Sequence, residues 1–376
     1  MPHARRRSGL ATLVLACAAL FGGPATHAQP VAPARLAAVL ACTPGQPCAE
    51  SLPVKVVIVT MFEIGQDSGD APGEFQFWKE RRHLVTRIAF PQSHHDLFYN
   101  AQTGELGMVT GMGSIRSATA TLALGLDPRF DLSHAYWLVA GIAGIDPRRA
   151  SIGSAAWAQY LVDGDLAHEI DAREIPQDWK HGRFALHSKG PNDPAPADPT
   201  VHGEMFALNP ALADWAYRLT SDTPLADDPQ IAAERARFAG FPMAQRPPFV
   251  LKGDNLAAMT FWHGQRMTEW AGDWVRFWTR GKGEFVTSAM EDTGTMQAIT
   301  ILSQVGRADR NRVMVLRAGS NATMPPPGVA PAPYLLRENQ GYAGMHAALE
   351  NLYRVGSRVI DALLAGWSRY AAAPPQ

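Results

Sequence analysis

The residues with the clearest chemical potential follow an apolar run near the C-terminal end of the sequence. Residues 313–316, "VMVL", lead directly into Arg317, Ser320 and Asn321. A strand that only filled a core would end in an ordinary turn, whereas this one presents three hydrogen-bonding side chains at its C-terminal end. Open α/β sheets bind their ligands at that edge. We therefore expect these side chains to face a ligand.

A second group of candidates lies in "TSAMEDTGTMQA", residues 287–298. Met290 and Glu291 stand at the start of an apolar stretch with helical spacing. One interpretation of an acidic side chain at this position is that it caps the helix and has no other role. A fixed carboxylate such as that of Glu291 can instead accept hydrogen bonds from the hydroxyl groups of a sugar. The residues alone leave both interpretations open.

Two glycine-containing turns each follow an apolar stretch. Gly111 and Gly113 lie in "TGMGSIRSATA", and Gly141 lies in "VAGIAGIDP". Glycines let a ligand approach the backbone, and N–H groups at a helix N-terminus attract anions. Together with Arg116, these glycines form a candidate anion or water site. A tight turn without a ligand is the alternative, and the dinucleotide pattern G-x-G-x-x-G is not followed.

Other patterns give narrower expectations. Trp270, Trp274 and Trp278 recur at four-residue spacing, which is typical of a helix face buried in a core. The sequence has no G-x-S-x-G elbow, no P-loop, no H-E-x-x-H and no paired-cysteine metal pattern, so common hydrolase and kinase chemistry is not supported. We expect neither a metal nor an organic cofactor.

The charge balance limits the class of partner. Lysine and arginine number 34 and aspartate and glutamate 35 among 376 residues, without a long run of one sign. This composition gives no basic surface for nucleic acid or for an anionic membrane. The apolar fraction of 46% is enough to fill a sizeable core. A small molecule is therefore the expected partner.

The N-terminal part differs in composition from the rest. Residues 1–28 contain an arginine run, an apolar stretch and small residues before a cleavage point, which predicts a signal peptide. A twin-arginine signal and a lipoprotein anchor at Cys17 are the alternatives. We expect an exported protein, periplasmic or extracellular, that is soluble once the signal peptide is removed.

Residues 29–52 are rich in alanine and proline and are interpreted as a linker. Within them, Cys42 and Cys48 enclose a short turn in "CTPGQPC". An exported protein meets an oxidising environment, and two thiols without a nearby histidine pair are a poor zinc site. We therefore expect a small disulfide loop with a structural role.

Residues 53–376 alternate apolar runs with helical patterns, which predicts one three-layer α/β/α domain with a central, mainly parallel, mixed sheet. Expected strands lie at 54–60, 106–110, 136–140 and 313–316. Expected helices lie at 114–124, 291–305 and 347–367. Residues 174–249 are richer in proline and polar side chains and are interpreted as an insertion, a composition found in binding loops and lids.

Several motifs occur in an order that resembles one protein family. They are "TGMG" at 110–113, "AGIAG" at 140–144, "GDN" at 253–255, "AMEDTG" at 289–294, "RAGSN" at 317–321 and "LYRVGS" at 352–357. In this order they resemble the purine nucleoside permease family, within the nucleoside phosphorylase and nucleosidase superfamily. The resemblance implies a nucleoside phosphorylase-like fold and a pocket for purine nucleosides.

The resemblance also implies roles for particular residues. Met290 and Glu291 would hold the ribose, and Asn321 would contact N7 of the purine. An asparagine donates and accepts hydrogen bonds but cannot give up a proton as an aspartate does. The further candidates for the base-binding side are Ser320, Leu256 and Asp254.

Two residues are the candidates for catalysis. Nucleosidases of this fold draw an acidic residue from just after the first strand, and Glu63 in "TMFEIG" stands there. Glu63 would activate water, while Asn321 would stabilise the negative charge that builds on the departing base. The resemblance therefore implies cleavage of an N-glycosidic bond in support of nucleoside uptake.

The arginine and serine that phosphorylases place around the second glycine turn are absent. We therefore favour hydrolysis over phosphorolysis, with phosphate a disfavoured co-substrate. The alternative function is that of a non-catalytic binding component of transmembrane nucleoside transport. A separate membrane transporter and a second copy of the chain in a homo-oligomer are the further expected partners.

Overall fold

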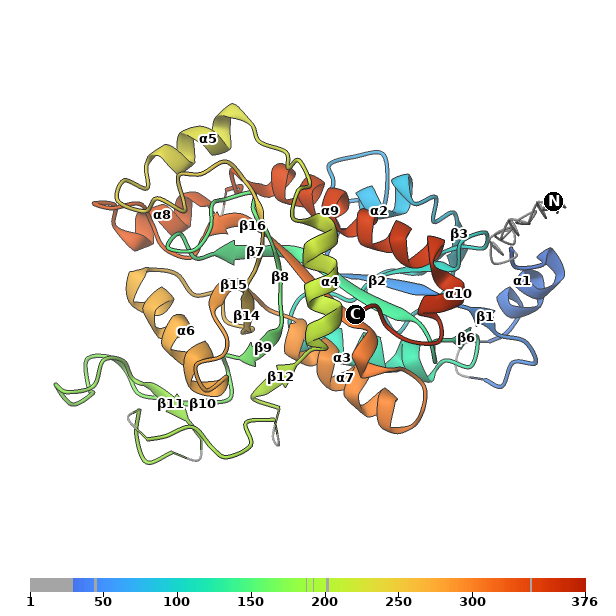
Figure 1. Cartoon of the computed structure of the whole chain (residues 1–376), viewed down its shortest axis with the longest axis horizontal. Coiled ribbons are helices and arrows are strands. Elements are labelled where there is room, and N and C mark those ends of the chain that lie inside the picture. The colour runs from blue at the N-terminus through green and yellow to red at the C-terminus, as the bar shows by residue number, and fades with distance from the viewer. Residues whose placement is uncertain (1–29, 44–45, 187, 192, 201–202, 339) are drawn as a thin grey trace, which may run out of the picture.

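The computed structural model describes residues 30–376 apart from 44–45, 187, 192, 201–202 and 339 (Figure 1). The predicted signal peptide, residues 1–28, lies outside the described residues. The strands are β1 (Leu52–Pro53), β2 (Val56–Thr60), β3 (Thr86–Ile88), β4 (Leu97–Asn100), β5 (Glu105–Val109), β6 (Phe130–Asp131), β7 (Tyr136–Ile145), β8 (Ala155–Trp157), β9 (Tyr160–Asp163), β10 (Ala167–Glu169), β11 (Arg183–Ala185), β12 (Met205–Ala207), β13 (Val250–Lys252), β14 (Asp254–Ala257), β15 (Phe285–Ala289) and β16 (Val313–Ala322). The helices are α1 (Pro33–Leu40), α2 (Gln76–Arg81), α3 (Ser114–Leu126), α4 (Pro210–Thr220), α5 (Pro229–Ala236), α6 (Gln265–Trp278), α7 (Asp292–Gln304), α8 (Pro331–Glu338), α9 (Met345–Ala365) and α10 (Trp367–Tyr370).

A 12-stranded mixed sheet forms the centre of the molecule, with the main path β12-β9-β14-β15-β7-β2-β5-β4-β3. The central strands β5, β2, β7 and β16 run parallel to their neighbours in this group. β16 also pairs with β8, which in turn pairs with β13. The predicted mainly parallel, mixed sheet is confirmed.

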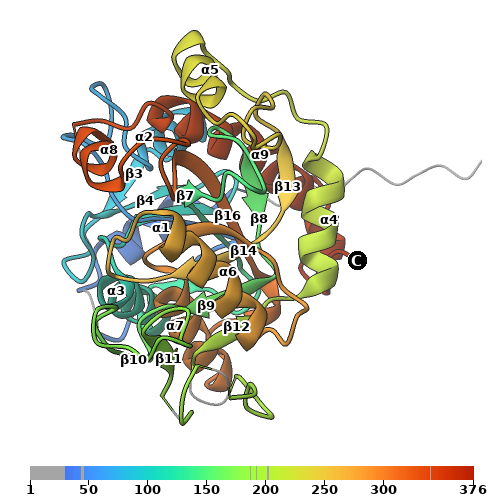
Figure 2. The ribbon, with the colours of Figure 1, turned by 90° about the vertical axis from the view of Figure 1, so that its left-hand side faces the viewer.

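Alternation along the central strands explains why helices cover both faces of the sheet. Val57 and Val59 of β2 pack in one apolar cluster with residues of α3 and α7, whereas Val56 and Ile58 pack in another with residues of α9. Successive side chains of a strand point to opposite faces, so a strand apolar at every position must be buried on both. Figure 2 shows β7 and β16 between α9 above and α3 and α7 below. The predicted three-layer α/β/α arrangement is confirmed.

The expected elements are present, and the two most important strands are longer than expected. β7 extends beyond the expected 136–140 to Ile145, and β16 extends beyond the expected 313–316 to Ala322, so the polar residues after "VMVL" belong to the strand itself. Ser288 at the end of β15 pairs with Gly144 near the end of β7. The ends of β7, β15 and β16 therefore meet in one place.

Two segments contain more structure than their composition indicates. The predicted linker includes α1, which begins with Pro33, a residue favoured in the first turn of a helix. Val39 of this helix is buried in the apolar core. The disulfide between Cys42 and Cys48 is confirmed. In the predicted insertion, β12 joins the main sheet beside β9, and Leu212 and Ala216 of α4 pack in the apolar cluster that contains α9. These two elements belong to the body of the domain.

The tryptophans of α6 are part of the core, as their spacing predicts. Trp270, Trp274 and Trp278 are buried in one apolar cluster with Leu256 and Phe285.

Among the described residues, no helix combines the length and apolar character needed to cross a membrane.

Candidate functional site

A cavity of about 300 Å³ lies where the ends of β7, β15 and β16 meet, beside the segment that follows β2. Its apolar lining includes Met61, Phe62, Met112, Ile142, Ala258, Phe261, Trp262, Met290 and Met345. Its polar lining consists of Glu74, Thr260, Ser288, Glu291, Arg317, Ser320, Asn321, Thr323 and Tyr342. Mostly apolar walls with a few convergent polar groups are typical of a small-molecule site.

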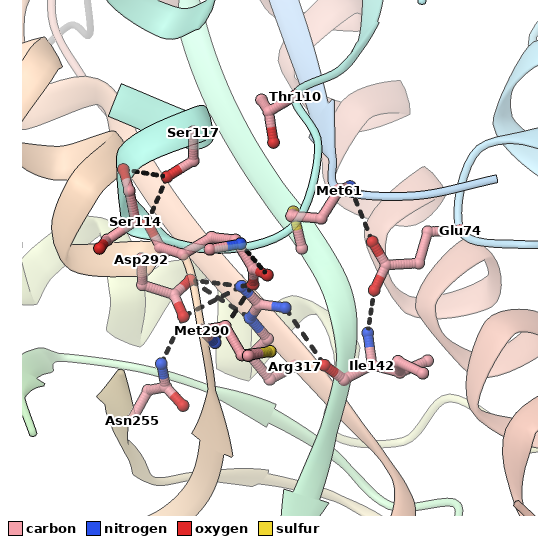
Figure 3. Close-up of polar contacts among 12 residues, drawn as sticks. Met61, Glu74, Thr110, Ser114, Ser117, Ile142, Asn255, Met290, Asp292 and Arg317 are labelled. Atoms are coloured by element: carbon pink, nitrogen blue, oxygen red, sulfur yellow. Dashed lines mark hydrogen bonds and ion pairs between the residues drawn. The ribbon is translucent and has the colours of Figure 1, made fainter. Parts of the chain in front are cut away.

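Arg317 is the centre of the polar network at this cavity (Figure 3). Its side chain is 1% exposed, and its Nη2 donates to Oε2 of Glu291 and to Oδ1 of Asp292, both at 3.0 Å. Its Nη1 donates to the carbonyl oxygen of Ile142 at 3.2 Å. A buried guanidinium requires such partners because desolvation of an isolated charge is costly. The contacts fix Arg317 in one orientation.

Glu291 is held at the N-terminal end of α7 by donors from three directions. Its Oε1 accepts from the backbone N–H of Gly113 at 3.1 Å, and its Oε2 accepts from that of Met290 at 3.2 Å as well as from Arg317. Burial raises the pKa of Glu291, and the charge of Arg317 opposes that shift. Gly113 has a φ of 91°, a conformation that favours glycine, so the turn can direct its N–H at the carboxylate.

Asp292 completes the opposite side of the arginine. Its Oδ2 accepts from Nδ2 of Asn255, whose Oδ1 in turn accepts from the hydroxyl of Thr287 at 3.1 Å. Asp292 and Asn255 are both fully buried or nearly so. This chain of hydrogen bonds links β14, β15 and β16 beneath the cavity and supports the geometry of Arg317.

Glu74 is the third carboxyl group of the network and comes from the segment between β2 and α2. Its Oε2 accepts from the N–H of Met61 at 2.8 Å, and its Oε1 accepts from that of Ile142 at 2.7 Å. Burial raises the pKa of Glu74 to about 8, although Arg317 lowers it. A carboxyl group with a raised pKa at the wall of a cavity can serve as a proton acceptor or donor.

Asn321 and Ser320 form another side of the cavity. Both are buried at the end of β16, and the hydroxyl of Ser320 donates to Oδ1 of Asn321 at 3.1 Å. Phe261 and Tyr342 also line the cavity, and their ring planes are nearly parallel, at 5°, with centroids 6.5 Å apart. Flat aromatic faces beside an amide suit a planar heterocycle, which stacks on rings and forms hydrogen bonds at its edge.

The structure brings together Met290, Glu291, Ser320 and Asn321, which all line the cavity. Gly141 is not among the lining residues but precedes Ile142, which is, and the side chains of Met61, Arg317 and Glu74 pack against its Cα atom. Met290, Glu291, Ser320 and Asn321 therefore surround one ligand-sized space, and their roles toward a ligand stay predictions.

Glu63 lies elsewhere, and this is the main difference from the sequence prediction. Its carboxylate accepts hydrogen bonds from the backbone N–H groups of Ile64, Gly73, Phe75 and Gln76. It is not among the residues that line the cavity. A carboxylate with four amide donors stabilises the loop before α2. Glu74, at the far end of the same loop, has the position near the cavity that the sequence assigns to Glu63.

Leu256 and Asp254 also differ from their predicted placement. Leu256 is fully buried in the apolar cluster of α6. Asp254 accepts from the backbone N–H groups of Gln159, Tyr160 and Glu284, and burial raises its pKa to about 6. Both belong to β14, which β15 separates from β7, so the residues after this strand reach the cavity instead.

The predicted anion or water site is divided by the structure. Gly111 and Arg116 lie outside the cavity lining, and Arg116 is exposed, near His94. Gly113 uses its N–H to hold Glu291. Asp292 and Glu74 were not predicted as site residues. Asp292 stands at the start of an expected helix, where an acidic residue is most simply explained as a helix cap, and Glu74 lies in the loop after the first strand, where no helical or strand pattern indicates which side chain faces the cavity. One sequence feature could have identified Asp292: the arginine of "RAGSN" follows an apolar run, and a buried arginine needs an acidic partner.

Comparison with known proteins connects this geometry to a family. The family model described as purine nucleoside permease matches residues 53–375. The chain belongs to the purine nucleoside permease family. This match confirms the resemblance of the sequence motifs. A protein of Schizosaccharomyces pombe named probable purine nucleoside permease is 28% identical over 321 residues, which cover 84% of this chain and 90% of that protein.

Two further proteins are similar to this chain. The purine nucleoside permease of Candida albicans is 28% identical over 332 residues, covering 86% of this chain and 78% of that protein. Among solved structures, a 5'-methylthioadenosine/S-adenosylhomocysteine nucleosidase from Neisseria meningitidis aligns with a TM-score of 0.47 at 14% identity, over 83% of this chain and all of that one.

Proposed function

We propose that this protein binds a purine nucleoside in the cavity and hydrolyses its N-glycosidic bond. The family membership supports a nucleoside as the ligand. The observation that carries the proposal of catalysis is Glu74, a buried carboxyl group whose pKa is raised to about 8, at the cavity and beside the ion pair of Arg317 and Glu291.

The charged groups of the cavity and the amide of Asn321 each have a role in this reaction. Glu291 accepts hydrogen bonds from ribose hydroxyl groups, since each carboxylate oxygen can accept more than one. Its negative charge also stabilises the positive charge that develops on the sugar as the bond breaks. The base lies against Phe261 or Tyr342 and receives a hydrogen bond from Asn321. Arg317 keeps Glu291 oriented and ionised.

The chemical step transfers one proton and breaks one bond. A water molecule attacks C1′ of the ribose and gives its proton to the carboxylate of Glu74. The electron pair of the C1′–N bond leaves with the base, and the Asn321 N–H stabilises the negative charge that develops there. The proton on Glu74 is then released to solvent or to the departing base, which restores the carboxylate.

Phosphorolysis is disfavoured by the cations available. Among the described residues that line the cavity, Arg317 is the single arginine and no lysine is present. Its guanidinium already binds Glu291, Asp292 and the carbonyl oxygen of Ile142. A phosphate dianion would therefore meet carboxyl groups without a free counter-charge, which is electrostatically unfavourable.

A second function, nucleoside binding without cleavage in a transport system, is favoured by the asparagine at position 321. An amide stabilises a departing base less well than an acid that can protonate it. Export by the N-terminal segment and a membrane partner belong to this proposal. Export is testable by N-terminal sequencing of the protein recovered from each compartment of its host.

One assay tests both functions. Purified protein is incubated with inosine, adenosine and guanosine, with and without phosphate, and free base and free sugar are quantified. Phosphate-independent release of equal amounts of base and ribose supports hydrolysis. Binding of nucleoside by calorimetry without any release selects the transport function. Release that requires phosphate and produces ribose 1-phosphate overturns the hydrolytic proposal.

A further inference from the structure

Asn321 lines the cavity described above, and its neighbour Ser320 also lines a second cavity of about 410 Å³. Ser320 lines both, whereas Glu338 of α8 lines only the second. The Asn321 side chain therefore faces the first cavity and also interacts with Glu338 of α8, which lines the second.

Glu338 is an unusual residue for its position. It is 8% exposed, and its Oε2 is buried without a hydrogen-bond partner among the described residues. Burial raises the pKa of Glu338 to about 7, and interactions with the side chains of Tyr334 and Asn321 oppose this shift. A buried carboxyl group is costly unless it serves an interaction, and Asn321 is the neighbour that faces the first cavity.

An asparagine side chain can present either its oxygen or its NH₂ group, and the two orientations recognise opposite ligand atoms. The Ser320 hydroxyl donates to Oδ1 of Asn321 at 3.1 Å, which identifies the oxygen end. A carboxyl group beside the same amide can accept from Nδ2, which identifies the nitrogen end. In the structure Nδ2 of Asn321 donates to the carbonyl oxygen of Ala322 at 3.4 Å, which favours the same orientation as the contact with Ser320.

We propose that Glu338 is a positioning residue for base recognition. With Ser320 it holds the Asn321 amide so that an N–H, and not the carbonyl oxygen, faces the first cavity. The matching ligand atom is a ring nitrogen with a free lone pair, such as N7 of a purine. This inference rests on the proposed function, because it assigns the part of the base that the site reads.

The role does not require a particular protonation state of Glu338. An ionised carboxylate accepts through either oxygen, and the neutral acid still accepts through its carbonyl oxygen. A glutamine at position 338 keeps such an acceptor, whereas a methionine of similar volume does not. The two substitutions therefore separate loss of the acceptor from loss of packing.

The test compares free bases with analogues in which N7 is replaced by C–H. Adenine, hypoxanthine and guanine are each paired with the corresponding 7-deaza compound, and dissociation constants are measured by calorimetry. Free bases contain no glycosidic bond, so no turnover disturbs the titration. A neutral hydrogen bond contributes about 1 kcal/mol, so wild-type protein should prefer the best natural base by about fivefold to tenfold.

Glu338→Met should reduce this preference to about twofold or less, while Glu338→Gln should keep it. Arg337→Gln is the matched control on the same helix, because Arg337 pairs with Glu234 at 3.5 Å. This variant should keep the preference. A merely structural role of Glu338 would weaken both members of each pair equally and leave the ratio unchanged.

The outcomes separate the two proposals. If wild-type protein binds neither nucleosides nor bases, the proposed function fails, and this inference fails with it. If it binds nucleosides but does not distinguish the 7-deaza compounds, only the inference about N7 fails. A preference that survives in a folded Glu338→Met variant overturns the role of Glu338. Thermal melting of each variant verifies folding.

Discussion

Glu74 and Arg317 approach each other over the Cα atom of Gly141. A Cβ atom added at Gly141 would lie 2.7 Å from Oε1 of Glu74 and in still closer contact with Nη1 of Arg317. The backbone carbonyl of the next residue, Ile142, binds Arg317, and its N–H binds Glu74. One short piece of β7 therefore sets the separation of the two charged groups.

We predict that Gly141→Ala disrupts this arrangement. The added methyl group must displace the Cε methyl group of Met61 as well as Arg317 and Glu74, and overpacking of a buried site costs about 1–3 kcal/mol of unfolding free energy. Base release should fall at least tenfold, since small displacements at a reacting centre are costly. Urea denaturation and the base-release assay measure the two effects.

Gly272→Ala in α6 is the control, because the nearest atoms to an added Cβ there are 3.6 Å away. It should be stable and fully active. Wild-type activity in a folded Gly141→Ala variant would show that the separation of Glu74 and Arg317 is not critical.

Glu74→Gln should abolish most base release while leaving nucleoside affinity within about threefold of wild type. The amide cannot accept the proton of the attacking water, and removal of a general base typically costs 10²–10⁴-fold in rate. Single-turnover kinetics and calorimetry test the two statements separately. Undiminished release would exclude Glu74 as the base.

Glu63→Gln should instead affect stability. The carboxylate of Glu63 accepts from four backbone N–H groups, including those of Gly73 and Phe75, and an amide replaces only part of these contacts. We expect a loss of about 1–3 kcal/mol of unfolding free energy, which is typical of hydrogen bonds to a charged group. The kcat of folded protein should change less than tenfold. A loss of kcat as large as that of Glu74→Gln would return the catalytic assignment to Glu63.

The parts of the site that sequence predicted are those that follow strands. Asn321 and Ser320 end an apolar run, and Glu291 follows another, so the general rule that ligands bind at strand ends places them together. The order of the strands in the sheet could not be predicted from the sequence. In the structure β15 separates β14 from β7, so Asp254 and Leu256 do not face the cavity.

Glu74 was missed for a different reason. The loop between β2 and α2 leaves the sheet and returns, and two acidic residues, Glu63 and Glu74, occupy its ends. Each can bind backbone N–H groups or face the cavity, and local propensity does not distinguish these outcomes. Glu74 is held at the cavity by the N–H groups of Met61 and Ile142, which come from different parts of the chain.

The rate of base release should increase with pH and level off above about pH 8. Glu74 must be ionised to accept a proton, and burial raises its pKa to about 8. A profile of kcat from pH 6 to 9.5 tests this relation. A rate that is constant over this range would mean that no group with such a pKa acts as the base.

The same pKa predicts a pH dependence of stability. Glu74 has a higher pKa in the folded protein than the ordinary value of 4.5, so the folded state binds more protons between pH 4.5 and 8. The unfolding free energy contributed by this group is therefore largest below pH 4.5 and decreases as the pH rises to about 8. Asp254 and Glu338, with pKa values raised to about 6 and 7, act in the same direction. Glu74→Gln should reduce the decrease measured by urea denaturation at pH 5.5 and 8.5.

Arg317→Met should be the most destabilising of these substitutions. It leaves Glu291 and Asp292 buried without their counter-charge, and breaking a buried ion pair from one side costs about 3–5 kcal/mol. The loss should be smaller at pH 5.5 than at pH 8.5, because Glu291 and Glu74, whose pKa values are raised by burial, become neutral more readily at the lower pH. Urea denaturation at both pH values measures the difference.

Arg87→Met provides the comparison for Arg317→Met. Arg87 pairs with Asp96 at 2.7 Å, but its side chain is 73% exposed, and such pairs contribute at most about 1 kcal/mol. It should therefore unfold almost like wild type at both pH values. If Arg317→Met lost no more stability than Arg87→Met, the carboxyl groups around Arg317 would have to be neutral in the resting protein. Glu291 would then bind ribose as an acid, and its charge could not stabilise the developing oxocarbenium ion.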